Sequence, residues 1–286
     1  MPFWKRKPKD ADKAPTVRPE EQTVEPVHES HAPTRLLSYR IANLQGVGAR
    51  PRQEDSFTFV NAMDVVKMRD EGLLAILADG MGGMQDGKAA SEAAIASMRA
   101  DFQKLDRSGN IPQQLCRMID HAGDCVLSML GGAGGSTAVV CLFYEEKLWF
   151  ACIGDSALFL LRDGELCRLN REHNVRNERY LASIRAGSMD PSFGREDREG
   201  HALTQFIGMQ GMDEADFLLK PLPLHDGDRI LLCSDGVADM VPGPALRACM
   251  EASAPQEVCD KIAQAVLAAN NPYQDNYTAL YVQCGY

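Results

Sequence analysis

The chain has 286 residues, of which 45% are hydrophobic and 24% are charged, the composition of a soluble globular protein. It lacks the run of about 18 apolar residues that a membrane-spanning helix needs, and no apolar core follows the basic residues 5–7 as in a secretory signal. The net charge of −10 is unsuited to nucleic acid, whose phosphate backbone requires a positive surface. We therefore expect a cytoplasmic protein that neither spans a membrane nor binds nucleic acid.

The first 34 residues have a composition of their own. They hold six of the fifteen prolines, six basic residues and six acidic residues, and they show almost no apolar spacing. Such a segment cannot bury enough apolar surface to offset the entropy of ordering it. We expect residues 1–34 to be a disordered tail.

Regular patterns begin at residue 35. Residues 73–78 are an apolar run typical of a buried strand, and residues 87–105 and 112–130 have the apolar spacing of helices. Further strands are predicted at 137–144, 147–153, 157–162, 165–169, 229–233 and 277–284, and further helices at about 244–252 and 255–269. Asp163-Gly164 is a strong hairpin signal between two of these strands.

The order of these elements indicates the fold class. Runs of strands, each accompanied by a pair of helices and without regular βαβ alternation, are typical of an α+β protein with antiparallel sheets. Residues 170–202 are polar and lack clear periodicity, so they are predicted to be an insertion. No linker interrupts residues 35–286, and we expect a single domain.

Aspartates stand at the ends of several predicted strands. Asp79, Asp155 and Asp235 follow apolar runs, and Asp275 precedes the last strand. If that strand runs antiparallel to the others, all four carboxylates lie at one edge, where they repel one another unless a cation joins them. Oxygen ligands, with the carbonyl of Gly80 as a candidate, suit Mg²⁺ or Mn²⁺. Two such ions about 3.5–4 Å apart acidify a bridging water and hold a phosphoryl group.

A charged segment upstream extends this set. Glu54 and Asp55 can add ligands or hold metal-bound waters. Arg50 or Arg52 can bind phosphate oxygens through a planar fork of donors. None of the nine cysteines has the arginine spacing of a tyrosine-phosphatase site, and no G-x-S-x-G motif occurs. A metal-bound water is therefore favoured over a covalent nucleophile.

An ordered series of motifs spans about residues 46–284. Its members are Gly48-x-Arg50-x-x-x-Glu54-Asp55-Ser56, Ala78-Asp79-Gly80-Met81-Gly82-Gly83, Gly135-Ser136-Thr137-Ala138, Gly154-Asp155-Ser156, Leu203-Thr204, Ser234-Asp235-Gly236 and Asp275-Asn276-x-Thr278. In this order they resemble the metal-dependent serine/threonine protein phosphatases (the PPM, or type 2C, family) in their compact bacterial form. The resemblance implies a four-layer αββα sandwich, in which two antiparallel sheets are flanked by helix pairs.

The resemblance also implies roles for individual residues. A core of two Mn²⁺ or Mg²⁺ ions would be bound by Asp79, the carbonyl of Gly80, Asp235 and Asp275. Glu54 and Asp55 would support the second metal, and Asp155, with Asp235, would contribute to a third and weaker site. Arg50 would contact the substrate phosphate, and residues 170–202 would be the mobile flap beside the cleft.

The chain departs from the family pattern at several positions. Met84 stands where bacterial members usually have histidine, and Met81 where eukaryotic relatives have a histidine proposed as general acid. Gln53 and Ala157 replace the usual Asn and Arg. Protonation of the leaving group therefore has no assigned residue, with a metal-bound water or His173 as candidates. Every carboxylate of the metal core is present, so we expect an active enzyme.

We accordingly expect a monomer that hydrolyses phosphoserine and phosphothreonine on proteins with a water bridging two metal ions, and so reverses a serine/threonine kinase. One alternative is an inactive module of the same fold that binds phosphoproteins. Another is a phosphatase that acts on anti-sigma-type regulators, although no sensor domain is attached. Substrate profiling distinguishes the two enzymes, and the sequence does not.

Overall fold

The structure is a computed structural model that describes residues 36–81, 86–188, 199–212 and 215–286. Three expectations from the sequence fall wholly or partly outside these ranges. They concern the tail at residues 1–34, the motif positions Gly82, Gly83 and Met84, and part of the polar insertion, residues 189–198. Residues Leu36–Tyr286 form one compact unit. Within the described part of that unit, no helix has both the length and the apolar character needed to cross a membrane.

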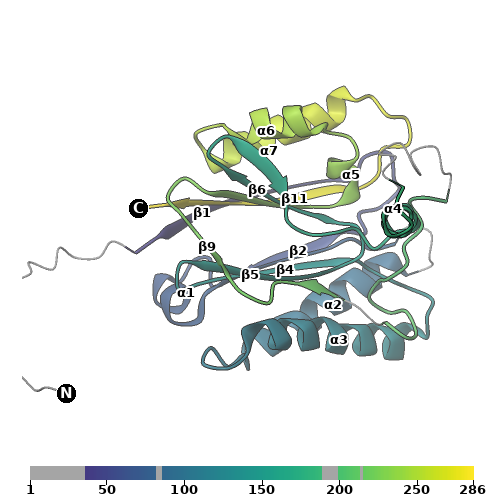
Figure 1. The fold of residues 1–286 in the computed structure, drawn as a ribbon, viewed down its shortest axis with the longest axis horizontal. Coiled ribbons are helices and arrows are strands. Elements are labelled where there is room, and N and C mark those ends of the chain that lie inside the picture. Colours follow the sequence, from purple (N-terminus) through teal and green to yellow (C-terminus); the bar gives the residue numbers. More distant parts are fainter. Residues whose placement is uncertain (1–35, 82–85, 189–198, 213–214) are drawn as a thin grey trace, which may run out of the picture. The chain divides into compact units, whose positions relative to one another are not determined.

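Two antiparallel sheets lie face to face (Figure 1). The first contains, in spatial order, β1 (Ser38–Gly46), β11 (Tyr277–Gly285), β10 (Arg229–Cys233), β6 (Ala157–Arg162) and β7 (Glu165–Arg168). The second contains β2 (Ser56–Val60), β3 (Leu73–Ala78), β4 (Ala138–Tyr144), β5 (Lys147–Ile153) and β8 (Asp216–Phe217), with β9 (Leu222–Pro223) also paired to β5. The predicted α+β class with antiparallel sheets is confirmed.

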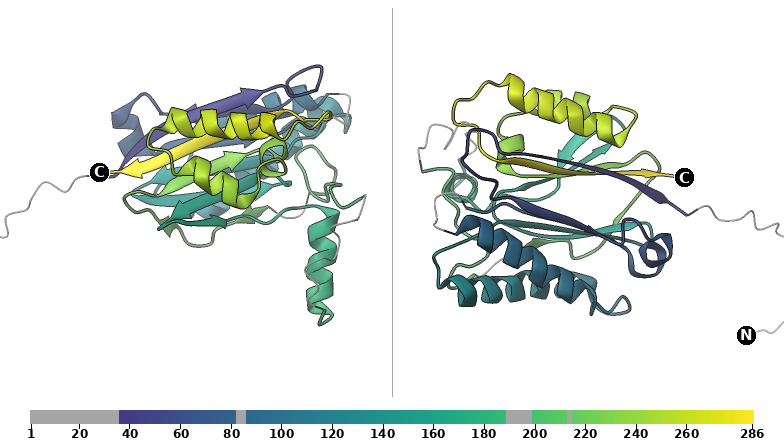
Figure 2. Two further views of the ribbon diagram at one scale, coloured as in Figure 1. Left: turned by 90° about the horizontal axis from the view of Figure 1, so that it is seen from above. Right: turned by 180° about the vertical axis from the view of Figure 1, so that it is seen from behind.

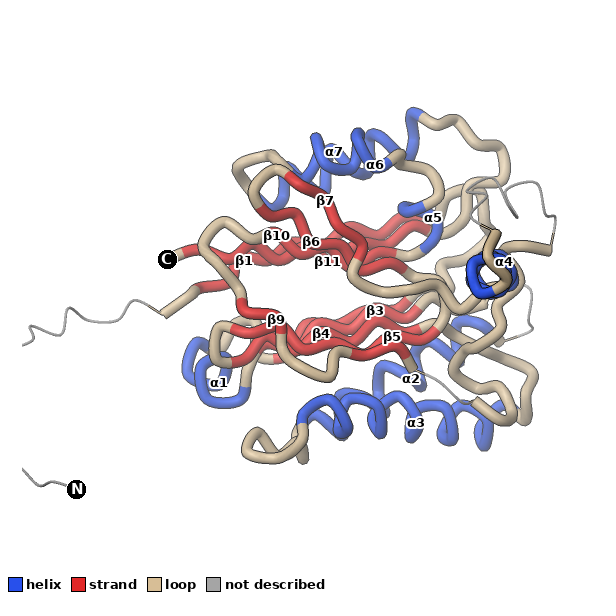
Figure 3. Tube along the Cα trace, viewed as in Figure 1, coloured by secondary structure: helices blue, strands red, loops and turns tan. Residues whose placement is uncertain are grey.

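Helices cover the outer face of each sheet, as Figure 3 shows. The helices are α1 (Val65–Glu71), α2 (Gly87–Phe102), α3 (Ile111–Leu130), α4 (Val175–Arg185), α5 (Asp235–Ala238), α6 (Gly243–Met250) and α7 (Pro255–Ala268). The pair α2 and α3 lies on the second sheet, and the pair α6 and α7 lies on the first. The layers therefore follow the predicted order of helices, sheet, sheet and helices.

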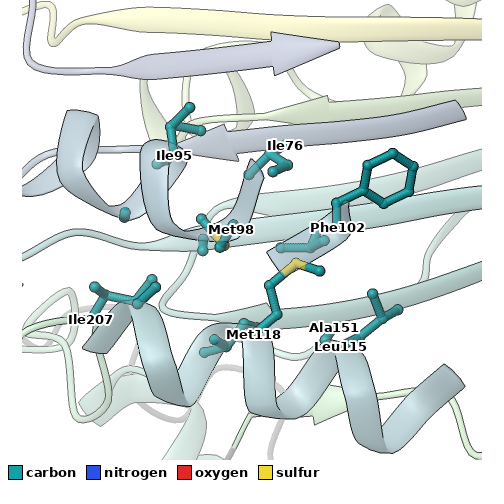
Figure 4. Packing of buried hydrophobic residues seen from close by; sticks show 14 of the residues in the cluster. Ile76, Ile95, Met98, Phe102, Leu115, Met118, Ala151 and Ile207 are labelled. Atoms are coloured by element: carbon teal, nitrogen blue, oxygen red, sulfur yellow. The ribbon is translucent and has the colours of Figure 1, made fainter. Parts of the chain in front are cut away.

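Strand β3 shows why the core is continuous through these layers. Its six residues are all completely buried, because one face meets the other sheet and the opposite face meets the helices. Ile76 turns toward the helices, where Met98 and Phe102 of α2 and Met118 of α3 pack in the same cluster (Figure 4). Burial on both faces explains the unbroken apolar run of this strand, since no position needs to be polar.

The structure also contains elements that the sequence patterns did not predict. Edge strand β1 packs Tyr39 and Ile41 against the core between the sheets. Its next apolar residues, Ala42 and Leu44, pack against the core under α6 and α7, so the apolar positions do not alternate regularly and give a weak signal. Helix α4 lies inside the segment predicted to be an irregular insertion, and it buries none of its residues. It projects away from the sheets in the view from above in Figure 2. A helix without a buried face shows no apolar periodicity, which is why this one was missed.

Candidate active site

The strand register places five aspartates at one end of the two sheets. Ser56 at the start of β2 pairs with Ala78 at the end of β3. In the other sheet, Cys233 at the end of β10 is level with Ala157 of β6 and Ala279 of β11, near the starts of those strands. The residues that adjoin these strand ends are Asp55, Asp79, Asp155, Asp235 and Asp275. The last strand, β11, runs antiparallel to β10, which meets the condition under which Asp275 lies at the same edge as Asp235.

The charges of these aspartates act on one another. Burial, and then the charge of Asp55, raises the pKa of Asp79 well above the ordinary value of 3.8. Burial and then the charge of Asp155 raise the pKa of Asp235 well above the same value. The pKa of Asp155 itself rises to about 7, through burial and then the charge of Glu172. A site that disfavours several negative charges at once is suited to a divalent cation, which would make the ionised forms favourable.

Asp55 supplies a second sign that the site fits a metal ion. Its side chain is completely buried, and its Oδ2 accepts a hydrogen bond of 2.6 Å from the Thr278 hydroxyl. Its Oδ1 is buried without a hydrogen-bond partner. A buried carboxylate oxygen without a partner is unfavourable, and a cation nearby relieves that cost. The surrounding donors are all oxygens, which suit Mg²⁺ or Mn²⁺.

The aspartates interact through their charges without forming a closed ligand set. Across the ranges that the structure describes, no group of three or more His, Cys, Asp or Glu side chains is arranged to hold a metal ion. Two carboxylates are engaged with other partners, Asp55 with Thr278 and Asp275 with Arg50. The assignment of metal ligands therefore stays a prediction, which the chemistry of the donors supports.

Main-chain contacts hold Asp79 in place. Its N–H donates to the Thr137 hydroxyl at 3.1 Å, and its carbonyl oxygen accepts from the Thr137 N–H at 2.9 Å. The same hydroxyl lies 2.8 Å from that of Ser156, the neighbour of Asp155. The next residue, Gly80, has no room for a side chain, because a Cβ there would lie 2.4 Å from the carbonyl oxygen of Gly87. The end of β3 is thus fixed against the turn that carries Asp155.

Asn276 fixes the loop that carries Arg50, Glu54 and Asp55. Its amide nitrogen donates to the carbonyl oxygens of Val47 at 2.9 Å and Arg52 at 3.1 Å. Its amide oxygen accepts from the Glu54 N–H at 2.7 Å. The side chain is 4% exposed, so these bonds are shielded from water. From the sequence, Asn276 is recognisable only as part of a motif, since its partners are more than 220 residues away in the chain.

The two candidate phosphate-binding arginines have different surroundings. Nη2 of Arg50 lies 2.6 Å from Oδ2 of Asp275, and both side chains are more than one-third exposed, at 43% and 37%. The hydrogen bond to Asp275 raises the pKa of Arg50 further above its ordinary value. Arg52 instead pairs with Glu54 at 2.7 Å. Arg50 is therefore the arginine at the aspartate edge, where its donors can reach a phosphate.

A small pocket adjoins Asp155 and Asp235, and three basic residues that the sequence analysis did not single out line it. They are Arg168, Arg176 and His201. Arg168 donates to the carbonyl oxygen of Asp155 at 2.8 Å and also pairs with Glu172. No sequence motif indicated these neighbours, because Arg168 comes from β7, while Arg176 of α4 and His201 come from the segment 170–202 that shows no periodicity.

The sequence matches the family described as Protein phosphatase 2C over residues 52–269. The chain belongs to this family. It is 28% identical over 204 residues to Protein phosphatase PhpP of Streptococcus pneumoniae. This alignment covers 69% of this chain and 80% of that protein. It is 25% identical over 229 residues to Serine/threonine phosphatase stp of Listeria monocytogenes, with coverage of 77% and 87%.

The fold is shared with solved phosphatases. A crystal structure of the catalytic domain of the serine threonine protein phosphatase PstP in complex with 2 manganese ions superposes with a TM-score of 0.69 at 24% identity. The match covers 88% of this chain and 100% of that one. The resemblance drawn from the motifs, and the sandwich that it implied, are thus confirmed.

His173 has a structural place in this phosphatase 2C domain. It is only 5% exposed, and its Nδ1 accepts a hydrogen bond of 3.1 Å from the N–H of Gly154. Its own N–H donates to the carbonyl oxygen of Gly154 at 2.9 Å. These contacts hold the turn before Asp155, and they indicate a positioning role rather than that of a general acid. Of the two methionines at the family's histidine positions, Met84 lies outside the described residues.

Proposed function

We propose that this phosphatase 2C protein hydrolyses phosphoserine and phosphothreonine on protein substrates and requires two Mn²⁺ or Mg²⁺ ions. The observation that carries the proposal is the convergence of five aspartates from both sheets beside an exposed arginine. A curated relative is named a serine/threonine phosphatase, and a protein of the same fold has been crystallised with 2 manganese ions.

The proposed metal ligands are Asp79, the carbonyl of Gly80, Asp235 and Asp275, with Glu54 and Asp55 in support and Asp155 at a third, weaker site. When bound, the ions supply a water of lowered pKa and positive charge for the phosphoryl oxygens. The protein's own part is to hold those carboxylates at one edge, through the contacts of Thr137, Asn276 and Thr278.

Arg50 is proposed to stabilise charge on the transferred phosphoryl group. Its guanidinium is exposed and close to Asp275, so its fork of donors can face phosphoryl oxygens held at the aspartate edge. Such preorganised donors stabilise the transition state, where charge spreads over the equatorial oxygens. Helix α4, which belongs to the proposed flap of residues 170–202, lies at this end of the sheets (Figure 1).

We place the enzyme in the cytoplasm, in a signalling role opposite a serine/threonine kinase. The test is hydrolysis of p-nitrophenyl phosphate and of a phosphothreonine peptide by protein freed of metal, with and without added Mn²⁺. Turnover is expected only with the metal, and Asp235→Asn is expected to abolish it. Asp226→Asn is the matched control, because Asp226 is exposed and accepts a hydrogen bond from the N–H of the C-terminal residue, Tyr286.

Three results would favour other conclusions. Wild-type turnover by Asp235→Asn would show that the metal assignment is wrong. Metal-independent binding of the phosphopeptide, with no turnover in either condition, would favour the inactive binding module. Turnover on anti-sigma-type regulators but not on phosphorylated kinases would support the other enzyme considered from the sequence.

A further inference from the structure

A groove of about 410 Å³ lies beside the proposed active site. One side is made by residues 47–49, and the other by Val266 and Leu267 of α7. Residues 270–272 and Gln274 of the following loop and Tyr277 of β11 complete the lining. Its size is in the range of sites that bind ligands. The function proposed above makes no use of it.

The groove is continuous with the phosphate-binding edge. Its first side ends at Ala49, which precedes Arg50, and its second side ends at Gln274, which precedes Asp275. The N–H of Ala49 donates to the carbonyl oxygen of Gln274 at 2.8 Å, so the two sides are joined where they meet the active site. An extended peptide advances about 3.3 Å per residue. The residues next to a phosphorylated residue at Arg50 therefore reach the groove.

Among the residues that the structure describes, those lining the groove include no charged side chain. This is unusual for a surface of a chain in which 24% of residues are charged. Two aliphatic side chains are exposed there, Val47 at 41% and Leu267 at 61%. A charged side chain placed between them would lose water without gaining an ionic partner, whereas an apolar side chain would bury their surface.

Gln274 fixes the part of the groove that adjoins the proposed active site. The residue is 6% exposed, and its amide nitrogen donates to the carbonyl oxygens of Gly236 at 3.0 Å and Asp275 at 3.1 Å. These two hydrogen bonds fix the end of the groove that adjoins Asp275.

We propose that this groove binds the substrate segment that flanks the phosphorylated residue and selects apolar, uncharged side chains in that segment. The inference rests on the proposed phosphatase function. The occupant is an extended stretch of a phosphoprotein, with an aliphatic side chain against Val47 and Leu267.

The experiment uses the full chain with Mn²⁺ and two phosphothreonine peptides. The leucine peptide has leucines on both sides of the phosphothreonine, and the aspartate peptide has aspartates at the same positions. The wild type is expected to favour the leucine peptide by about tenfold or more in kcat/KM, the effect of burying one aliphatic side chain. Leu267→Lys is expected to lower kcat/KM for the leucine peptide by about tenfold relative to that for p-nitrophenyl phosphate. Leu219→Lys, at a leucine that is 79% exposed and outside the groove lining, is the matched control and keeps the preference.

The outcomes separate the two proposals. Equal hydrolysis of both peptides by the wild type, or a full preference retained by Leu267→Lys, would overturn the groove proposal and leave the phosphatase function standing. Failure to hydrolyse either peptide or p-nitrophenyl phosphate would overturn both. Leu267→Ser serves as a second variant if the lysine variant does not fold, and thermal melting of each variant establishes folding.

Discussion

Replacing Asp155 with asparagine would remove one charge from the aspartate edge and keep the shape of the side chain. Burial and the charge of Glu172 raise the pKa of Asp155 from 3.8 to about 7. The folded protein therefore holds this proton more tightly than the unfolded chain does. The stability of the metal-free protein should fall as the pH rises from about 4 to about 7, because the unfolded chain gives up this proton over that window while the folded protein keeps it.

The size of the effect follows from the same pKa. Each pH unit of difference between the folded and unfolded pKa corresponds to about 1.4 kcal/mol. For a pKa of about 7 against 3.8, ionised Asp155 costs the folded state on the order of 4 kcal/mol at pH 8. The amide that replaces the carboxyl group in Asp155→Asn does not ionise, so the variant should avoid this cost.

The assay is urea unfolding in EDTA at pH 4.5 and pH 8 for wild type, Asp155→Asn and Asp260→Asn. We expect Asp155→Asn to be more stable than wild type by up to a few kcal/mol at pH 8 and by only about 1 kcal/mol at pH 4.5. Asp260 is exposed on α7, so its variant should match wild type at both values. Added Mn²⁺ should stabilise the wild type more than Asp155→Asn, since a ligand stabilises the state that binds it. A variant less stable than wild type at pH 8 would refute this account of the aspartate edge.

Two further substitutions test the loop that carries Arg50. Asn276→Asp replaces the amide donor with an oxygen that faces the carbonyls of Val47 and Arg52. We therefore expect kcat/KM to fall at least about tenfold. We also expect a weaker Mn²⁺ affinity, measured by isothermal titration calorimetry. A lower melting temperature with unchanged kinetics would contradict the positioning role. Arg50→Ala should lower kcat/KM for p-nitrophenyl phosphate by about 10²-fold, while Arg52→Ala, the matched control, should have a much smaller effect. Equal losses in both variants would show that the two arginines were wrongly distinguished.

Several parts of the fold could be predicted because their signal is local. The apolar run of β3 reflects burial on both faces, and the four-residue spacing of Ala90, Ala94, Met98 and Phe102 reflects one buried face of α2. Asp163 and Gly164 both adopt positive φ angles, 52° and 79°, as their hairpin signal predicted. The half-exposed strand β1 and the exposed helix α4 were missed, because neither buries a regular face.

The candidate site divides in the same way. The sequence by itself determined that aspartates adjoin the strand ends and that their oxygens suit a hard divalent cation, because strand ends and turn residues are set within a few positions of one another. Only the tertiary structure decided that Thr278 holds Asp55, that Asn276 holds the Arg50 loop, and that an uncharged groove adjoins Arg50. Those contacts join residues more than 220 positions apart. They exist only once antiparallel pairing has set the register of both sheets, which no local pattern encodes.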